Sequence, residues 1–260
     1  MPKYVIITES ITDNVLRMFE ELDSRGVEYN CLTPRNIFLL EQVISKVDGV
    51  INLSSNVELD KYIDSTVRVF NQPKSVYTCG DKWLTYLKLY PYDIEQPFTS
   101  KDKRDFPKLP YVMKHRKGSL GEQVYLVKHS EEVSKVRSKI GPDVIYQEFI
   151  STSYGVGLKA MIIGGEVVTC VLKQGEGFIA NMHQGCKTEV YKMSELEKAL
   201  CKQVSDVLGM DYCGIDILFG ENGQPIVCEV NANAIVENIE NATGVNVMGA
   251  YVDYILSQTK

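Results

Sequence analysis

Residues 214–233, GIDILFGENGQPIVCEVNAN, contain two apolar runs separated by the turn-forming pair Asn222-Gly223. This pattern predicts an antiparallel hairpin. Asp216 and Glu229 lie roughly equally far from the turn, so both carboxylates are expected on one face of the hairpin at the same level, with Asn231 beside them. A charge in an apolar strand is costly unless it is paired or binds a metal. Two carboxylates and an amide oxygen suit Mg²⁺. The alternative is an edge hairpin whose acidic groups face solvent.

The segments before this hairpin carry further turn and cap signals. Residues 194–208 predict a helix, because they begin with the capping-box pattern Ser-Glu-Leu-Glu and are followed by Gly209. Gly164-Gly165 predicts the turn of a second hairpin. Its strands are expected at 158–163 and 166–173, with further strands at 111–114, 123–127 and 144–149 and helices at 79–89 and 131–139.

The N-terminal segment alternates between short apolar runs and helical spacing. Strands are expected at 4–8, 27–32 and 50–53, and helices at 13–25 and 39–46. Such alternation is typical of a small parallel α/β domain, which ends near residues 71–73. The chain is therefore assigned to the α/β (α+β) class.

Composition excludes several classes of protein. The 260 residues are 44% hydrophobic and 24% charged, with a net charge of −6, so neither disorder nor a nucleic-acid-binding surface is indicated. No apolar run approaches the roughly 20 residues of a membrane helix. The N-terminus turns polar after Ile7, unlike a signal peptide, so a cytoplasmic protein is expected. The seven cysteines include no Cys-x-x-Cys pair and are expected to be free thiols.

Two further segments have the residue types of a nucleotide site. Lys114 ends a predicted strand before the glycine-containing stretch 115–121, where an ammonium group and backbone N–H groups suit phosphate. The spacing is not that of a Walker A loop, and an ordinary basic turn is the alternative. Residues 146–150, YQEFI, can offer backbone groups to a purine edge, but any strand end can do the same.

In combination and in this order, these segments resemble the ATP-grasp superfamily, and more narrowly its RimK-type branch, the group of the ribosomal-protein S6 glutamate ligases. The resemblance runs from about residue 71 to residue 256. Its motifs are NQPKSVYTCGDKWLTYLKL, YVMKHRKGSLGEQV, YQEFI, FIANMHQG, GIDIL, CEVNAN and NATGVNVMGAYVDYIL. It implies a Rossmann-like pre-ATP-grasp domain at 1–75 and an ATP-grasp domain at 76–260, with a lid subdomain at about 108–150.

The resemblance also implies roles for individual residues. ATP would be bound through Lys82, Lys114, Gly118, Ser119, Gly121, Gln147, Glu148, Phe149, Ile150 and Asn181. Asp216, Glu229 and Asn231 would bind Mg²⁺, with Mn²⁺ as a substitute. Neutralising Asp216 or Glu229 is expected to abolish turnover and leave the fold intact.

This chain departs from the family pattern at several positions. Gly157 stands where the family commonly has Asp, which removes a ribose contact, and Lys159 and Lys173 stand where it has Arg. Ile179 replaces a further basic residue, and Cys186 replaces a glycine. Lysine keeps the positive charge but cannot make arginine's bidentate fork. These departures concern substrate identity more than nucleotide binding.

The implied reaction joins a small-molecule or peptide carboxylate to an amine, which is expected to be that of an amino acid, through an acyl phosphate. Lys159 and Lys173 would be the catalytic residues, because they offset charge on the transferred phosphoryl group. His183 is a candidate for positioning a substrate, or a structural histidine. The alternatives are a D-alanine–D-alanine-like dipeptide ligase and a non-catalytic nucleotide-binding regulatory protein. Relatives are often dimers or tetramers, and no nucleic-acid or membrane partner is expected.

Overall fold

The computed structural model describes residues 3–55, 57–62, 67–118, 121, 123–182 and 185–259. At the N-terminus, four parallel strands form a sheet in the order β2-β1-β3-β4. They are β1 (Lys3–Ile7), β2 (Glu28–Leu32), β3 (Gly49–Asn52) and β4 (Arg68–Phe70). Helix α1 (Asp13–Ser24) buries Val15, Met18 and Leu22 at helical spacing. The predicted parallel α/β arrangement is therefore confirmed.

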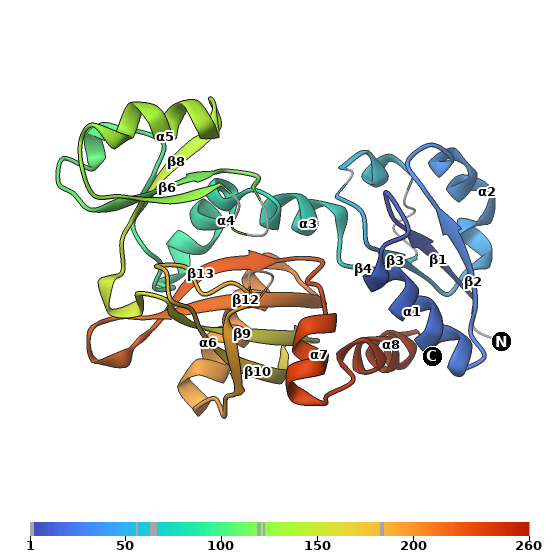
Figure 1. The fold of residues 1–260 in the computed structure, drawn as a ribbon. Helices are drawn as coiled ribbons and strands as arrows, with labels where there is room; N and C mark the ends of the chain where they lie inside the picture. The colour runs from blue at the N-terminus through green and yellow to red at the C-terminus, as the bar shows by residue number, and fades with distance from the viewer. Residues whose placement is uncertain are drawn as a thin grey trace.

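A second, antiparallel sheet lies at the centre of the molecule (Figure 1). Its order is β11 (Lys187–Val190), β10 (Glu166–Gln174), β9 (Val156–Ile163), β12 (Tyr212–Phe219) and β13 (Pro225–Asn231). Gly164 and Gly165, both with positive φ, form the predicted turn between β9 and β10. Helix α6 (Glu195–Leu208) packs on one face and has the predicted capping box, in which Ser194 and Glu197 bond reciprocally.

The third sheet stands apart from the central one, at the upper left of Figure 1. Its order is β5 (Thr99–Ser100), β8 (Val144–Glu148), β6 (Tyr111–His115) and β7 (Val124–Val127), and α5 (Glu132–Ile140) packs on it. Its core is built on the aromatic rings of Phe106, Tyr111 and Tyr146. We call these residues, 98–150, the lid.

Two predicted helices differ from the observed ones. The helix expected at 79–89 is two helices, α3 (Pro73–Cys79) and α4 (Lys82–Leu89). The break falls at Asp81, whose side chain accepts hydrogen bonds from the backbone N–H groups of Trp83 and Leu84 and so starts a new helix. The helix expected at 39–46 is α-helical only in α2 (Leu40–Val43), with 3₁₀ turns at Ile37–Leu39 and Ile44–Lys46.

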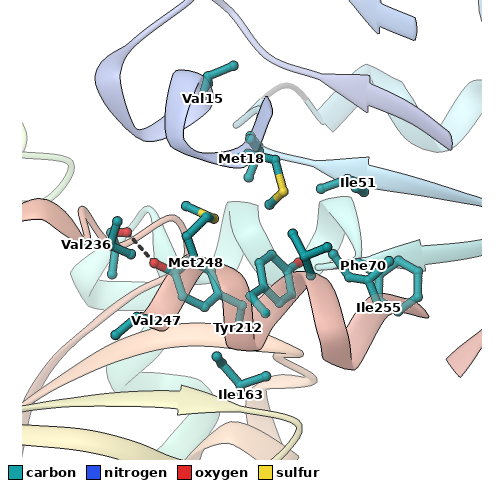
Figure 2. Close-up of a cluster of buried hydrophobic side chains, with 14 of the residues drawn as sticks. Val15, Met18, Ile51, Phe70, Ile163, Tyr212, Val236, Val247, Met248 and Ile255 are labelled. Atoms are coloured by element: carbon teal, nitrogen blue, oxygen red, sulfur yellow. Dashed lines mark hydrogen bonds between the residues drawn. The ribbon is translucent and has the colours of Figure 1, made fainter. Parts of the chain in front are cut away.

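The N-terminal sheet and the central sheet share one hydrophobic cluster (Figure 2). Met18 and Ile51 from the N-terminal part meet Tyr212 of the central sheet and Met248 of α8 (Val247–Gln258). Helix α8 therefore lies between the two sheets, next to α7 (Glu237–Thr243). No helix in the described ranges is long and apolar enough to cross a membrane.

A buried asparagine connects the same two parts. Asn71 follows β4, is fully buried and has a φ of 57°. Its Nδ2 donates to the carbonyl oxygens of Tyr212 (2.8 Å) and Ala232 (2.9 Å), and its Oδ1 accepts from the backbone N–H groups of Asp211 and Tyr212, both at 3.0 Å. The segment that leaves the N-terminal sheet is thereby fixed to the start of β12.

Candidate active site between the lid and the central sheet

A cavity of about 220 Å³ lies between the lid and the central sheet. Most of the predicted site residues line it: Lys114, Gly121, Gln147, Glu148, Phe149, Ile150, Lys159, Lys173, Asn181, Asp216, Glu229 and Asn231. Lys82 and Gly118 lie beside it and are bonded to each other, since the Lys82 ammonium donates to the Gly118 carbonyl. Ser119 and His183 lie outside the described residues. Sequence segments that are far apart in the chain are thus brought to one cavity.

The floor of the cavity is part of the face of the central sheet that also packs on α8. Along β9, Leu158 and Ala160 point toward α6, whereas Met161 belongs to the cluster around α8. Lys159 has the same orientation as Met161 because side chains alternate along a strand. It therefore lies on the α8 face, in the part of this face that borders the cavity.

Asp216 and Glu229 are cross-strand partners, as predicted, but a different turn and a β-bulge produce this register. Phe219 pairs with Pro225, and the loop between them is closed by a 2.8 Å bond from the Gly220 N–H to the Gln224 carbonyl. The hairpin loop is thus longer than the Asn222-Gly223 pair alone. The ladder then shifts by one residue, at Cys228. Without that shift, Asp216 would lie opposite Cys228 and Glu229 would face away from the cavity.

Three donors surround the carboxylate of Asp216. Lys159 Nζ lies 3.1 Å from Oδ2, Lys173 Nζ donates to Oδ1, and Asn231 Nδ2 lies 3.0 Å from Oδ2. Burial alone would raise the pKa of Asp216, but the charges of Lys159 and Lys173 and their hydrogen bonds outweigh it and hold the pKa well below its usual range. Asp216 is therefore an anion matched by two ammonium groups.

Glu229 has a different partner, Lys82, whose Nζ lies 3.1 Å from Oε1. Lys82 is the first residue of α4 and directly follows Asp81. Asp81 is almost fully buried and forms an ion pair with Arg116, which follows β6. The Lys82 N–H also donates to the Arg116 carbonyl at 2.9 Å. The cap of α4 and the end of β6 together place the Lys82 ammonium at the edge of the cavity.

Sequence reasoning missed several residues that line the cavity, and Cys228 is the one in contact with a predicted lysine. Its Sγ lies 3.7 Å from Nζ of Lys114, a lysine that is only 5% exposed. Cys228 lines the cavity because it sits at the bulge of β13. No sequence pattern marks a bulge of this kind, so the contact becomes visible only in the folded chain.

The end of the cavity nearest the lid strand β8 is formed by residues 147–150. Gln147 Nε2 donates to Thr99 Oγ1 at 3.0 Å. Glu148 is held by Phe98, because its N–H donates to the Phe98 carbonyl (2.8 Å) and its Oε2 accepts from the Phe98 N–H (3.1 Å). With both groups engaged, this strand end has a fixed shape, and Leu158 and Leu218 of the central sheet complete the wall.

Gly157 has a structural reason to be a glycine. A Cβ atom there would lie 3.0 Å from the carbonyl oxygen of Ile217 on the neighbouring strand β12. That distance is shorter than ordinary contacts, and a backbone atom cannot easily yield. The position therefore accommodates a close approach of β9 and β12, in addition to lacking the carboxylate that the family pattern suggested.

The acidic residues of the site suit a cation that takes only some of its ligands from the protein. Among the described residues, no three or more His, Cys, Asp and Glu side chains gather to hold a metal ion. Asp216 and Glu229 form a facing pair, and Asn231 adds an amide oxygen. Mg²⁺ usually keeps several waters and takes one or two carboxylates together with phosphate oxygens, which this donor set matches.

Comparison with known proteins agrees with this arrangement. The family model of the RimK-like ATP-grasp domain matches residues 87–255. The chain is 30% identical over 205 residues to N-acetylaspartylglutamate synthase A of Homo sapiens, which covers 73% of this chain and 52% of that protein. It thus spans about half the length of this relative.

Solved structures share the fold. The ATP-grasp ligase PsnB, complexed with its minimal precursor, Mg and ADP, superposes with a TM-score of 0.75 at 17% identity, covering 98% of both chains. D-alanine–D-alanine ligase from Bacillus anthracis, complexed with ATP, gives a TM-score of 0.73 at 17% identity, covering 100% of this chain and 97% of that one. At such identities the similarity establishes the fold alone.

Proposed function

The chain belongs to the RimK-like ATP-grasp family of carboxylate–amine ligases, and from this premise we propose that it forms an amide bond between a carboxylate and an amine, with Mg²⁺ and ATP. The observation that carries the proposal is the facing pair Asp216 and Glu229, with Asn231 beside it and lysines around it, at the edge of a cavity under a lid.

We assign nucleotide binding to the two ends of the cavity. Residues 147–150 form the wall against which a purine would lie, beside Leu158 and Leu218. Lys82 and Lys114 supply ammonium groups for phosphates, and Gly118, Gly121 and Asn181 lie beside them. Asp216, Glu229 and Asn231 would hold Mg²⁺, or Mn²⁺ in its place, and the cation would offset the negative charge of the phosphates.

The reaction then needs no nucleophile from the protein. The substrate carboxylate takes the γ-phosphoryl group of ATP, giving an acyl phosphate and ADP. The amine attacks the acyl carbon, phosphate leaves, and the amine loses a proton to complete the amide. Lys159 and Lys173 face the floor of the cavity and would offset the charge on the transferred group. Within the proposed ATP-grasp domain at 76–260, closure of the lid over the central sheet would exclude water, which hydrolyses acyl phosphates; the moving subdomain expected from the family resemblance, about residues 108–150, is the larger part of this lid.

The substrates follow less directly. The human relative is an N-acetylaspartylglutamate synthase, so we propose glutamate as the first amine to test, with small acids and peptides as carboxylates. A D-alanine–D-alanine-like dipeptide ligase is the second candidate, because an enzyme of that kind has the same fold and the fold alone does not select the substrates. We also propose a cytoplasmic protein with a homodimeric or homotetrameric assembly, and a boundary at residue 75 between the pre-ATP-grasp domain and the rest.

The test is ADP release by the purified protein with ATP and Mg²⁺ across a panel of acids paired with amino acids, D-alanine included. We expect ADP formation that depends on both substrates and a product with the mass of the amide. Glu229→Gln serves as the inactive control. If the protein binds ATP and Mg²⁺ but releases no ADP with any pair, the ligase proposal fails and the non-catalytic regulatory alternative stands.

A further inference from the structure

Asp216 is saturated with donors before any cation arrives. Both of its oxygens accept from ammonium groups, Oδ2 from Lys159 and Oδ1 from Lys173, and Asn231 adds a third bond. The two lysine side chains are only 17% and 12% exposed, so they are held in place rather than free in solvent. A carboxylate that binds Mg²⁺ must present an oxygen to it, and here each oxygen is already taken.

The backbone around these lysines explains how they reach Asp216. Lys159 is the direct cross-strand partner of Asp216. Its Cε and Nζ lie 3.4 Å from where a Cβ atom of Gly214 would be, so the side chain rests on a glycine of β12. Lys173 lies one strand further away, on β10, opposite Gly157. From there the Lys173 side chain extends across β9, and its Nζ donates to the same carboxylate.

The positive charges of Lys159 and Lys173 oppose the binding of a cation to Asp216 when no nucleotide is present. A divalent ion at Asp216 would lie close to two ammonium groups, and like charges at such distances repel strongly in a partly buried site. A nucleotide changes the balance, because its phosphates accept hydrogen bonds from both ammonium groups. The lysines can then leave Asp216 for phosphate oxygens while the cation takes the carboxylate.

We propose that Lys159 and Lys173 are positioning residues that hold Asp216 in place of a metal ion, so that the metal enters this site only together with the nucleotide. This rests on the proposed function for the identity of the metal site. The inference adds to the proposed function that the metal does not bind before the nucleotide, and that Lys159 and Lys173 have a second role besides offsetting charge. Metal and nucleotide then strengthen each other's binding by the same factor.

The experiment measures Mn²⁺ binding, by the loss of the free-ion electron paramagnetic resonance signal, with and without ADP, relative to protein-free samples that contain the same Mn²⁺ and ADP. Wild-type protein is compared with Lys159→Met, Lys173→Met and Lys173→Gln. Lys187→Met is the matched control, since Lys187 lies on the neighbouring strand β11, is exposed and pairs with Glu189. Folding of each variant is checked by urea unfolding, and Gln keeps a polar group where Met does not.

We expect wild type and Lys187→Met to bind Mn²⁺ weakly alone and roughly tenfold or more tightly with ADP. The variants at 159 and 173 should bind Mn²⁺ alone about tenfold more tightly than wild type, so that ADP adds less. The inference would be overturned if wild type bound Mn²⁺ equally well with and without ADP. It would also be overturned if the variants at 159 and 173 bound Mn²⁺ without ADP no more tightly than wild type does. If Mn²⁺ fails to bind even with ADP, the metal site of the proposed function itself is wrong. The gain in Mn²⁺ affinity without ADP is the result that depends on the two lysines, so any one of the three variants that folds decides the question.

Discussion

Asp216 and Glu229 face each other across the hairpin, yet their surroundings differ. Asp216 is held by Lys159, Lys173 and Asn231, whereas Glu229 pairs with one ammonium group among the residues that the structure describes, that of Lys82, and is more exposed. Removing one charge therefore leaves different groups unpaired in the two cases. The sequence alone suggested that both substitutions would leave the fold intact, and the contacts separate them.

Glu229→Gln is expected to remove activity without a large loss of stability. Amide formation should fall by more than the roughly 10–100-fold typical of groups that only support a metal ligand. The free energy of unfolding should change by less than about 1 kcal/mol, because the Glu229 side chain is 28% exposed and Lys82 stays bonded to the Gly118 carbonyl. ADP release and urea unfolding measure the two effects. Full activity in this variant would contradict the metal assignment.

Asp216→Asn is expected to remove activity and to destabilise the fold as well. It leaves Lys159 and Lys173 without their anion in a mostly buried setting, and breaking such a pair costs about 3 kcal/mol. Urea unfolding beside Glu229→Gln tests the difference. If both variants unfold at the same urea concentration, the two lysines do not depend on Asp216 for stability.

Much of the site could be predicted at the residue scale, because its motifs combine unusual residue types with fixed order. Lys114, Asp216 and Asn231 are charged or polar groups in apolar strands, which is a signal in any sequence. Cys228 and Asn71 carry no such signal. A half-buried cysteine and a buried asparagine with positive φ acquire their partners from chain segments that only the fold brings near.

At the scale of elements, the cap of α4 controls the place of Lys82. Asp81→Ala removes the cap bonds to Trp83 and Leu84 and the ion pair with Arg116. We expect a loss of about 3 kcal/mol in stability. We also expect a weaker affinity for ADP, since the first turn of α4, which places the Lys82 ammonium at the cavity, is no longer fixed by the cap. Calorimetric ADP binding and urea unfolding measure both. Ser194→Ala, which uncaps α6 away from the cavity, should lose stability and keep ADP affinity. Equal ADP affinity in both variants would contradict the role of the cap.

The bulge of β13 predicts an asymmetric response to deletions. Removing Cys228 straightens the ladder and still leaves Asp216 opposite Glu229, because the register beyond the bulge is unchanged. Removing Val230 instead moves Asn231 opposite Ile215, on the other face. We expect the first deletion to keep ADP binding with Mg²⁺ and the second to lose it, as measured by calorimetry. Loss of binding in both would show that the bulge itself is needed.

These two elements also mark the limit of sequence prediction. The start of α4 had a signal, since Gly80-Asp81 is a break followed by a cap residue. The bulge had none. The longer loop and the extra residue cancel, so the expected pairing of Asp216 with Glu229 was right although the assumed turn was not.

At the scale of the whole molecule, α1 and α8 hold the N-terminal part on the central sheet through a buried charge network. Glu21 of α1 accepts hydrogen bonds from Arg17 (2.9 Å), Arg25 (2.5 Å) and Asn246 (2.9 Å). Asn246 in turn caps α8. Burial alone would raise the pKa of Glu21, but the hydrogen bonds from these groups outweigh it and lower the pKa.

A lowered pKa in the folded state means that the Glu21 carboxylate stabilises the fold above its unfolded pKa and loses this effect as the pH falls. Glu21→Gln should therefore cost about 1–2 kcal/mol at pH 7, and less as the pH drops below about 4. Urea unfolding at both pH values measures this, with Glu20→Gln, an exposed partner of Arg17, as control. A difference that stays constant with pH would contradict the role of the charge.

The sequence predicted the N-terminal sheet but not that α8 packs on it. The alternation of strands and helices predicted the N-terminal sheet, since each element carries its own periodicity. That α8 would complete the core of this sheet was not visible, because an apolar helix does not specify which surface it covers. Tyr4 of β1 and Thr259 after α8 are hydrogen-bonded, although nearly the entire chain separates them.

This shared core has a consequence for synthesis on the ribosome. Strand β1 and helix α1 are made well over 200 residues before those that cover one face of their sheet, Met248 and Tyr251 among them. At about 5–20 residues per second, that face waits on the order of ten seconds or more for its partner. A nascent chain in this interval exposes an apolar surface to which chaperones can bind, and this sheet cannot complete its core until α8 has left the exit tunnel.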